Sequence, residues 1–377
     1  MRLALVHPYS WPRVRRGAER YLDDLAHYLA GQGHSVNVVT GTHGEVSIEK
    51  RDDGVTVYRL THLKPGPLCK VGLSEIETFG VRTASVLRRA RPDVVHAFTP
   101  SGAIAGRAAG RPTLYTVLGH PNAAQLPTKR VPRWLLGSAV RLSNAVAVLS
   151  RASATALRST FGRGAIVLPP GVRMERFVPN LEPRTGPPRL LFSATLTDRR
   201  KRADLAISTL ARLLERHPDA RLVLSGEGDP AWVTEEARRF GDKVSASIDV
   251  LGPGEPDEVP GRYRDATLTI LPAEHEAFGL SVVESLASGT PVVCSPGGGM
   301  SEIVGSAPVG STAATATPGS MADAVEMTLK LAQDGATPAR CVERARLWSW
   351  DETVGPQHEE CYRSLLARRQ PELEAIS

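Results

Sequence analysis

Two glutamates, Glu276 and Glu284, flank the short run Phe278-Gly279-Leu280. The surrounding pattern predicts a strand, a loop that holds Glu276, and a helix that Gly279 and Leu280 open. Free backbone N–H groups at a helix start can bind a phosphate. Glu284, in the second turn, can accept paired hydrogen bonds from a diol such as ribose. The segment therefore predicts a site for a ligand with hydroxyls on both sides of a diphosphate.

Isolated glutamate pairs are more often a solvated loop residue and a surface helix residue. The position of Glu276 at a strand end, beside Phe278-Gly279, favours the binding site. The residues discussed next support the same conclusion.

A cationic cluster, Arg199 to Arg202, follows the strand-like run at 190–193. Positive charge at a strand end can neutralise a diphosphate as its bond to a departing group breaks. Charge runs of this kind are usually solvated surface, but the strand-end position favours phosphate binding. Lys201 is the first candidate and Arg200 the second.

Two further candidates lie in the first half of the chain. Gly17 opens a predicted helix, where the lack of a side chain lets backbone approach a ligand closely; a plain turn glycine explains it equally well. His120 follows a strand-like run and is expected to contact a sugar hydroxyl or to orient an acceptor.

The elements that position these residues alternate between β-rich runs and amphipathic helical stretches, which is typical of doubly wound α/β domains. One helix is expected from about residue 16 to residue 31 and another from about residue 202. The expected strands are 3–6, 35–40, 55–60, 94–98, 113–117, 145–149 and 166–168, then 190–193, 222–225, 268–271 and 291–295.

A proline-rich stretch at 169–188 interrupts this alternation and is interpreted as a linker. We therefore expect an N-terminal acceptor-side domain over 1–170, a linker over 171–188 and a nucleotide-sugar-binding domain over 189–350. Two Rossmann-like parallel-sheet domains in series are expected to face a cleft that holds the ligand.

The composition is that of a soluble enzyme, with 377 residues, 41% hydrophobic and 23% charged. Apolar runs are shorter than the ~20 residues that cross a bilayer, and the amino terminus lacks a signal-peptide core. The four cysteines are scattered without metal or redox spacing. A cytoplasmic location is expected. The net charge of +6, without a basic or aromatic motif, does not predict nucleic-acid binding.

Taken together and in order, these motifs resemble family 4 of the retaining glycosyltransferases, which have the GT-B architecture. The resemblance covers nearly the whole chain. The resemblance rests on residues 276–284 with their continuation at 287–293, and on residues 17–34, 170–177, 225–228 and 350–366.

The resemblance implies a bacterial biosynthetic enzyme of class EC 2.4.1.-, a metal-independent retaining hexosyltransferase without a cofactor. Glu276 would contact the transferred sugar, Glu284 the ribose, and the backbone at 278–280 with Lys201 the diphosphate. Gly17 would complete that pocket from the other domain, and residues 351–377 would form a helix that returns to it. The sequence offers no Asp-X-Asp or clustered histidines that would contradict metal independence.

Two positions depart from the family pattern. Ala194-Thr195 stands where the family often has Gly-Arg, which removes one diphosphate-binding arginine. Arg200 or Arg202 is the expected substitute. Arg16 stands where a second glycine is common, and so alters the amino-terminal loop.

Other functions remain open. A nucleotide-sugar 2-epimerase shares the architecture, and a catalytically silent nucleotide-sugar-binding subunit is the alternative outside enzymes. An NAD-dependent enzyme is disfavoured because no strand–turn–helix carries Gly-X-Gly-X-X-Gly.

A UDP-sugar is favoured over a GDP-sugar as donor. The acceptor is a small molecule or a lipid; the basic amphipathic segment 127–142 is either a packed helix or a peripheral membrane contact.

Overall fold

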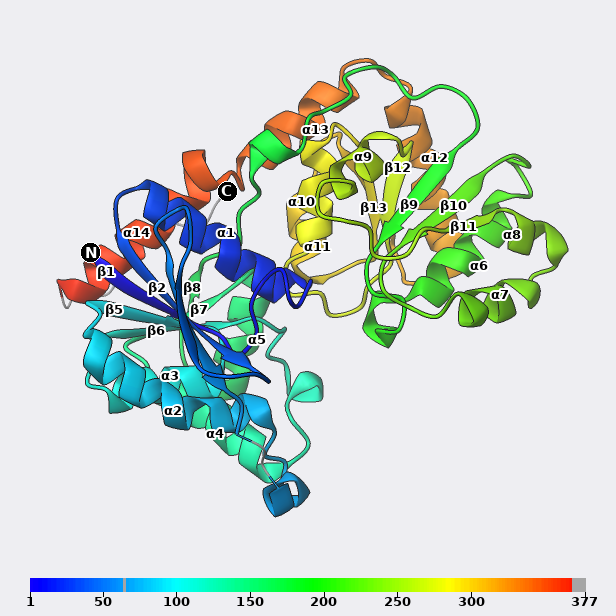
Figure 1. The fold of residues 1–377 in the computed structure, drawn as a ribbon. Coiled ribbons are helices and arrows are strands. Elements are labelled where there is room, and N and C mark those ends of the chain that lie inside the picture. The colour runs from blue at the N-terminus through cyan, green and yellow to red at the C-terminus, as the bar shows by residue number, and fades with distance from the viewer. Residues whose placement is uncertain (64–65, 368–377) are drawn as a thin grey trace. The chain divides into compact units, whose positions relative to one another are not determined.

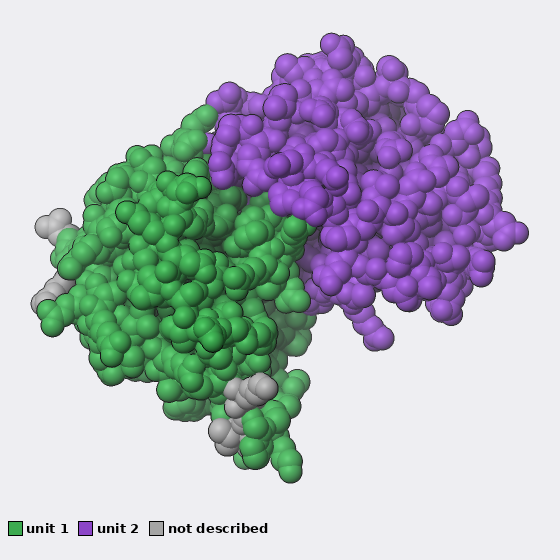
Figure 2. Space-filling model, viewed as in Figure 1, with its two compact units in different colours: residues 1–171, 350–377 green, residues 172–349 purple. Residues whose placement is uncertain are grey.

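The computed structural model describes residues 1–63 and 66–367. The chain forms two compact units (Figure 2). Unit 1 contains residues 1–171 and 350–377, and unit 2 contains residues 172–349. Residues 368–377 of the expected C-terminal segment lie outside the described part. Each unit has a parallel sheet with helices on both faces (Figure 1), as expected from the sequence.

The sheet of unit 1 has the order β3-β4-β2-β1-β5-β6-β7-β8. Its strands pair in parallel, except that β3 runs antiparallel to β4. Every residue of the central strands β5, β6 and β7 is buried, because helices cover both faces. The strands are β1 (Arg2–Val6), β2 (Ser35–Thr42), β3 (Ser47–Lys50), β4 (Thr56–Thr61), β5 (Val94–Ala97), β6 (Thr113–Val117), β7 (Ala145–Val148) and β8 (Ile166–Val167).

Two groups of helices cover this sheet. In Figure 1, α1 and α14 lie on one side and α2, α3 and α4 on the other, while α5 packs against β7 and β8. The helices are α1 (Gly17–Gly31), α2 (Glu75–Ala90), α3 (Pro100–Ala108), α4 (Arg130–Leu142), α5 (Arg151–Phe161) and α14 (Gly355–Leu366), with the short turns η1 (Gly66–Val71) and η2 (Ala123–Gln125).

The C-terminal helix α14 belongs to unit 1 and is anchored there by a buried hydrogen bond. Nδ1 of His358 lies 2.7 Å from the Val354 carbonyl oxygen, so this nitrogen carries the proton. Burial lowers the pKa of His358 to about 4, and the ring is neutral at pH 7. Nε2 is then an acceptor, and the hydroxyl of Tyr21 in α1 donates to it over 2.7 Å.

Aromatic packing extends this anchor. The π-helical turn η5 (Trp350–Val354) precedes α14, and the Trp350 ring stacks on Tyr28 at 6.2 Å. Gly171 lies directly beneath Trp350: a Cβ there would come within 2.7 Å of the indole. On α14, the Tyr362 hydroxyl lies 2.8 Å from Nδ1 of His96 in β5. Residues from both ends of the chain therefore build one core.

The sheet of unit 2 has the order β11-β10-β9-β12-β13-β14, with parallel pairing. The strands are β9 (Arg189–Ser193), β10 (Arg221–Ser225), β11 (Ile248–Val250), β12 (Leu268–Leu271), β13 (Val292–Cys294) and β14 (Gly310–Thr312). The sequence did not predict β3, β11 and β14. These strands have three or four residues each, and none is fully buried, so they lack the apolar runs by which the others were recognised.

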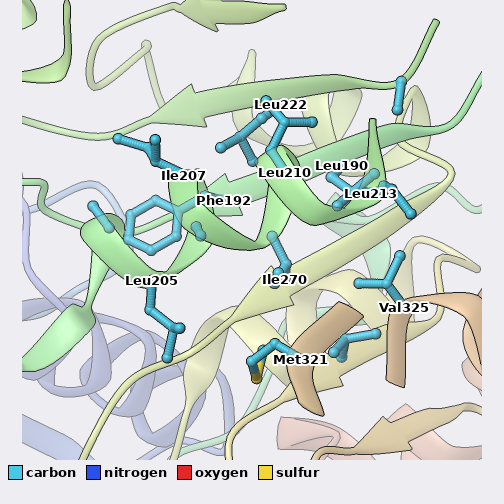
Figure 3. Close-up of a cluster of buried hydrophobic side chains, with 14 of the residues drawn as sticks. Leu190, Phe192, Leu205, Ile207, Leu210, Leu213, Leu222, Ile270, Met321 and Val325 are labelled. Atoms are coloured by element: carbon cyan, nitrogen blue, oxygen red, sulfur yellow. The ribbon is translucent and has the colours of Figure 1, made fainter. Parts of the chain in front are cut away.

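Helices α6, α7, α8 and α12 cover one face of this sheet and α9, α10, α11 and α13 the other (Figure 1). Figure 3 shows the first of these cores, where Phe192 of β9 and Ile207 of α6 meet aliphatic side chains from neighbouring strands and from α12. The helices are α6 (Ala203–Leu213), α7 (Pro230–Arg238), α8 (Asp242–Ala246), α9 (Val259–Arg264), α10 (Leu280–Ala287), α11 (Gly298–Val304), α12 (Pro318–Ala332) and α13 (Thr337–Arg346), with the short turns η3 (Met174–Arg176) and η4 (Arg199–Lys201).

Candidate functional site

The candidate site of unit 2 lies where the order of its strands reverses. Strand β9 pairs with β10 on one side and with β12 on the other. After β9 the chain continues to β10 on one side of the sheet, whereas after β12 it continues to β13 on the other side. In open α/β sheets, ligands bind outside the carboxyl ends of the strands at such a switch point. The loop after β9 contains Lys201, and the loop after β12 contains Glu276.

The loop after β9 is a short 3-10 turn that Asp198 organises. Its carboxylate accepts from the backbone N–H of Arg200 at 3.0 Å and pairs with the Arg200 guanidinium at 2.7 Å. Arg202 follows in the left-handed conformation, with φ of 56°, and begins α6. Asp198 therefore holds Arg200 locally, whereas the next side chain, Lys201, reaches the neighbouring loop.

An ion pair connects the two loops. Nζ of Lys201 donates to Oε2 of Glu276, and both side chains are about a quarter exposed. The backbone N–H of Glu274 also donates to the Arg200 carbonyl at 2.7 Å, and Arg202 pairs with the Glu274 carboxylate. The structure thus brings together Lys201 and Glu276, which the sequence analysis assigns to the diphosphate and to the transferred sugar.

Glycines hold the backbone of the Glu276 loop against the start of α11. The N–H of Gly299 donates to the Glu276 carbonyl at 3.0 Å. A Cβ at Gly298, which has φ of 70°, would lie 2.5 Å from that carbonyl oxygen, and one at Gly299 would lie 2.5 Å from Cα of Phe278. Only glycine permits this approach, so these residues fix the position of the Glu276 loop.

Helix α10 begins at Leu280 with Gly279 as its N-cap, as the sequence predicts. Gly279 has φ of 110° and no side chain to cap the helix, so the first backbone N–H groups are available to an anion. Ser281 in the first turn donates to the Ser193 carbonyl at 2.9 Å, which ties the start of α10 to the end of β9. The side chain of Phe278 is buried. Phe278, Gly279 and Leu280 therefore present backbone atoms at this edge.

Glu284 is buried, which excludes the alternative that it is a surface helix residue. The Tyr263 hydroxyl lies 3.0 Å from Oε2 of Glu284 and 3.0 Å from Oγ of Ser193. Because a carboxylate only accepts, the phenol donates to Glu284 and Ser193 donates to the phenol. Burial and the neighbouring Glu284 raise the pKa of Tyr263 well above its usual value. Glu284 is thus an oriented acceptor.

The segment Ala194-Thr195 packs against the turn after β10. A Cβ at Gly226 would lie 1.9 Å from the Ala194 carbonyl oxygen, and the N–H of Leu196 donates to the Glu227 carbonyl at 2.7 Å. Thr195 itself is half-buried. At the position where the family often has an arginine, this chain therefore has a short side chain on a tightly packed backbone.

The expected substitutes for that arginine are paired with carboxylates. Arg200 pairs with Asp198, and Arg202 pairs with Asp204 at 3.0 Å and with Glu274. A diphosphate that draws a second cation from this pair of arginines would share it with these carboxylates. Their assignment to the donor stays a prediction.

Gly17 and His120 lie in unit 1. Gly17 is the first residue of α1. His120 follows β6, and its Nδ1 lies 3.1 Å from Oγ of Ser153. Both roles assigned to them from the sequence stay predictions.

Sequence reasoning missed Tyr263, Ser193 and the Gly298-Gly299 turn as parts of this site. The run Gly297-Gly298-Gly299 is a visible signal for close backbone approach. Tyr263 carries no such signal, because it reaches Glu284 only through the packing of α9 against α10.

Two family descriptions together cover most of the chain. Residues 15–176 match Glycosyltransferase Family 4, and residues 174–348 match Glycosyl transferases group 1. The second segment contains the Lys201–Glu276 pair and Glu284, and the first contains Gly17 and His120.

Curated relatives carry related names. A glycogen synthase of Mycobacterium tuberculosis is 33% identical over 165 residues, which are 44% of this chain and 38% of that protein. The match therefore spans little more than a third of that relative. A D-inositol 3-phosphate glycosyltransferase of Geodermatophilus obscurus is 28% identical over 90% of this chain and 82% of its own length.

Solved structures share the fold across both units. Sucrose-phosphate synthase from Thermosynechococcus elongatus has a TM-score of 0.80 at 19% identity, and the match covers 97% of this chain and 99% of that one. Anabaena Alr3699/HepE in complex with UDP-glucose has a TM-score of 0.73 at 19% identity, covering 97% of this chain and 100% of that one. At these identities the likeness shows the fold alone.

Proposed function

The chain is a family 4 glycosyltransferase with the GT-B fold, and from this premise we propose a retaining, metal-independent hexosyltransferase. Its donor is a nucleotide-diphosphate sugar, with a UDP-sugar favoured over a GDP-sugar. Its acceptor is a hydroxyl of a small molecule or of a lipid. The observation that carries the proposal is the Lys201–Glu276 pair at the switch point of unit 2.

The geometry supports a division of roles along the donor. The backbone N–H groups at the start of α10 and Lys201 hold the diphosphate. Glu284, buried and oriented by Tyr263, accepts from the ribose hydroxyls. Glu276 accepts from hydroxyls of the transferred sugar. In the free protein Lys201 and Glu276 neutralise each other, and on donor binding each exchanges its partner for the donor.

Transfer then follows a front-face course in this proposal. The bond between the anomeric carbon and the diphosphate oxygen breaks while the acceptor oxygen bonds to the same face of that carbon. The acceptor proton passes to the departing phosphate. Lys201 and the N–H groups of α10 stabilise the negative charge that develops on the leaving group. Neither an enzymic nucleophile nor a covalent bond to Glu276 is required.

A silent nucleotide-sugar-binding subunit is the second candidate. Thr195 and the carboxylate-paired Arg200 and Arg202 favour it, because fewer cations are then committed to the leaving group. Such a subunit would bind nucleotide without transfer to any acceptor.

Calorimetric titration with UDP and with GDP, in buffer without added metal, tests the donor assignment. We expect UDP to bind with one site per chain and more tightly than GDP. Selective binding of GDP would indicate a GDP-sugar donor in place of a UDP-sugar. Binding of neither nucleotide to a folded protein would contradict the nucleotide-sugar site. Titration with UDP-glucose, as a representative UDP-sugar, would then measure how much the sugar adds.

Helix α4 is the feature of unit 1 that bears on a lipid acceptor. Its apolar side chains Trp134 and Leu142 are 67% and 54% exposed, beside Arg130, Arg133 and Arg141. Among the residues that the structure describes, no helix is both long and apolar enough to cross a bilayer. We propose that α4 rests on anionic membrane surface through these residues.

Liposome flotation tests this membrane contact. We expect the protein to float with vesicles that contain an anionic lipid and to remain in solution with neutral ones. Trp134→Ala should reduce flotation, whereas substitution of Val81→Ala, an exposed apolar residue on α2, should not. No retention on anionic vesicles would remove the hypothesis.

A further inference from the structure

Two histidines of unit 1 follow strand residues that are direct partners in the sheet. Strands β2 and β4 pair in parallel, with Thr42 opposite Thr61. His43 and His62 are the residues that come next, so both emerge at the carboxyl edge of this sheet. Glu75, the first residue of α2, lies at the same edge. Strand register therefore brings the two histidines together, and the start of α2 adds Glu75 to them.

The three side chains converge. One ring nitrogen from each histidine and one carboxylate oxygen of Glu75 all lie within 4.8 Å of one another. Nε2 of His43 is 3.8 Å from Oε2 of Glu75, and the centroids of the two imidazole rings are 5.0 Å apart. Two imidazoles and a carboxylate facing one point form a recurrent ligand set for a divalent metal.

His62 supplies an independent indication. The residue is only 8% exposed, and its Nδ1 is buried without a hydrogen-bond partner among the described residues. Leaving a buried polar atom unsatisfied costs stability. A metal ion bound at Nδ1 would give this buried nitrogen the partner that it lacks.

The backbone beneath the His62 ring is shaped for it. A Cβ at Gly41 would lie 2.1 Å from Cε1 of His62, so the imidazole ring occupies the space that a side chain at position 41 would need. The Tyr9 ring lies 5.6 Å away on a neighbouring loop. His62 is thus a fixed ligand, while His43, with its side chain 76% exposed, is free to close onto an ion.

We propose that His43, His62 and Glu75 form a binding site for a divalent transition metal of the Zn²⁺ class. Nitrogen ligands favour Zn²⁺ over Mg²⁺ or Ca²⁺, which prefer oxygen. Three protein ligands leave one tetrahedral position for water or an anionic oxygen. Zn–N bonds of about 2.0–2.1 Å place tetrahedral ligand atoms about 3.3 Å apart, so metal binding would require the partly exposed side chains of His43 and Glu75 to move closer to His62.

This metal site has no assigned role in the proposed sugar transfer. It belongs to unit 1, whereas Lys201, Glu276 and Glu284 belong to unit 2, and no step of the transfer passes through the metal. Metal binding and nucleotide binding can therefore succeed or fail independently.

Titration of metal-stripped, tag-free protein with Zn²⁺ tests the site, with Co²⁺ as a spectroscopic probe. We expect one equivalent of Zn²⁺ per chain, no comparable binding of Mg²⁺, and visible Co²⁺ absorption typical of fewer than six ligands. His43→Ala and Glu75→Gln should each weaken Zn²⁺ binding by more than about tenfold, the effect of losing even an outer partner. Both side chains are at least partly exposed, so the fold should persist, and circular dichroism checks it.

Two control variants make the test specific. His217→Ala removes a histidine that pairs with a single carboxylate, Glu326, at 3.1 Å, and Cys69→Ser removes the exposed thiol. Neither should change the affinity. Absence of a Zn²⁺ equivalent in the wild type, or binding that His43→Ala and Glu75→Gln leave unchanged, would overturn the proposal.

Discussion

Replacing Lys201 with alanine is expected to lower the rate of sugar transfer by roughly 10²–10³-fold, the usual effect of removing one preorganised group that stabilises developing negative charge. Lys201 is the cation that pairs with Glu276 across the two loops of the switch point. Its loss also removes an attraction for the diphosphate, so the affinity for UDP and for pyrophosphate should fall together. Steady-state kinetics and calorimetry measure the two effects.

Arg212→Ala is the matched control, because it removes one positive charge from the last turn of α6, where Arg212 pairs with Glu215 on the surface. This variant should keep both transfer and nucleotide affinity. Unchanged UDP affinity in Lys201→Ala would count against the whole phosphate assignment. Glu276, which loses its partner in this variant, is partly exposed and can be hydrated.

Glu284→Gln is expected to weaken UDP binding by roughly 10- to 150-fold, which corresponds to the about 1.5–3 kcal/mol of a hydrogen bond to a charged group. The substitution keeps the shape of the side chain and removes the charge that the ribose hydroxyls would donate to. Affinity for pyrophosphate, which has no ribose, should be unchanged. Calorimetry with both ligands thus separates this position from Lys201, whose loss should weaken both.

Tyr263→Phe separates the effect of the Glu284 carboxylate from the effect of the hydrogen bond that orients it. The variant removes the phenol that donates to Glu284 but leaves the carboxylate in place, so it should weaken UDP binding less than Glu284→Gln does. Equal loss of pyrophosphate affinity in Glu284→Gln would indicate that the helix start is distorted, and the ribose assignment would then fall.

The sequence predicted the fold where burial leaves a continuous apolar signal. Strands such as β6 and β12 are buried at every position, and their expected ranges are those of the structure. The three-residue strands β11 and β14 depend instead on pairing with a neighbour already in place. Their own residues carry too little information to be recognised.

The residues of the candidate site that directly follow a strand could be predicted from the sequence. Lys201 and Glu276 follow strands β9 and β12, and their pairing is a consequence of strand order. Tyr263 approaches Glu284 through helix packing, and Arg200 turns to a carboxylate two residues away. Side-chain choices of this kind depend on tertiary contacts that the linear pattern does not contain.

The histidines of unit 1 illustrate the same limit. His43 and His62 have no metal spacing in the sequence, which is why no metal ligands were expected there. Their proximity arises from the parallel register of β2 and β4, a property of the folded sheet.

The membership of α14 in unit 1 has a consequence for biosynthesis. His358 and Tyr362 complete a core whose other residues, such as Tyr21 and His96, leave the ribosome much earlier. At typical elongation rates, translation of the intervening unit takes roughly 10–40 s. During that interval the nascent unit 1 still lacks α14 and exposes the apolar face that α14 covers. A chaperone that engages this protein during synthesis would therefore meet its amino-terminal half.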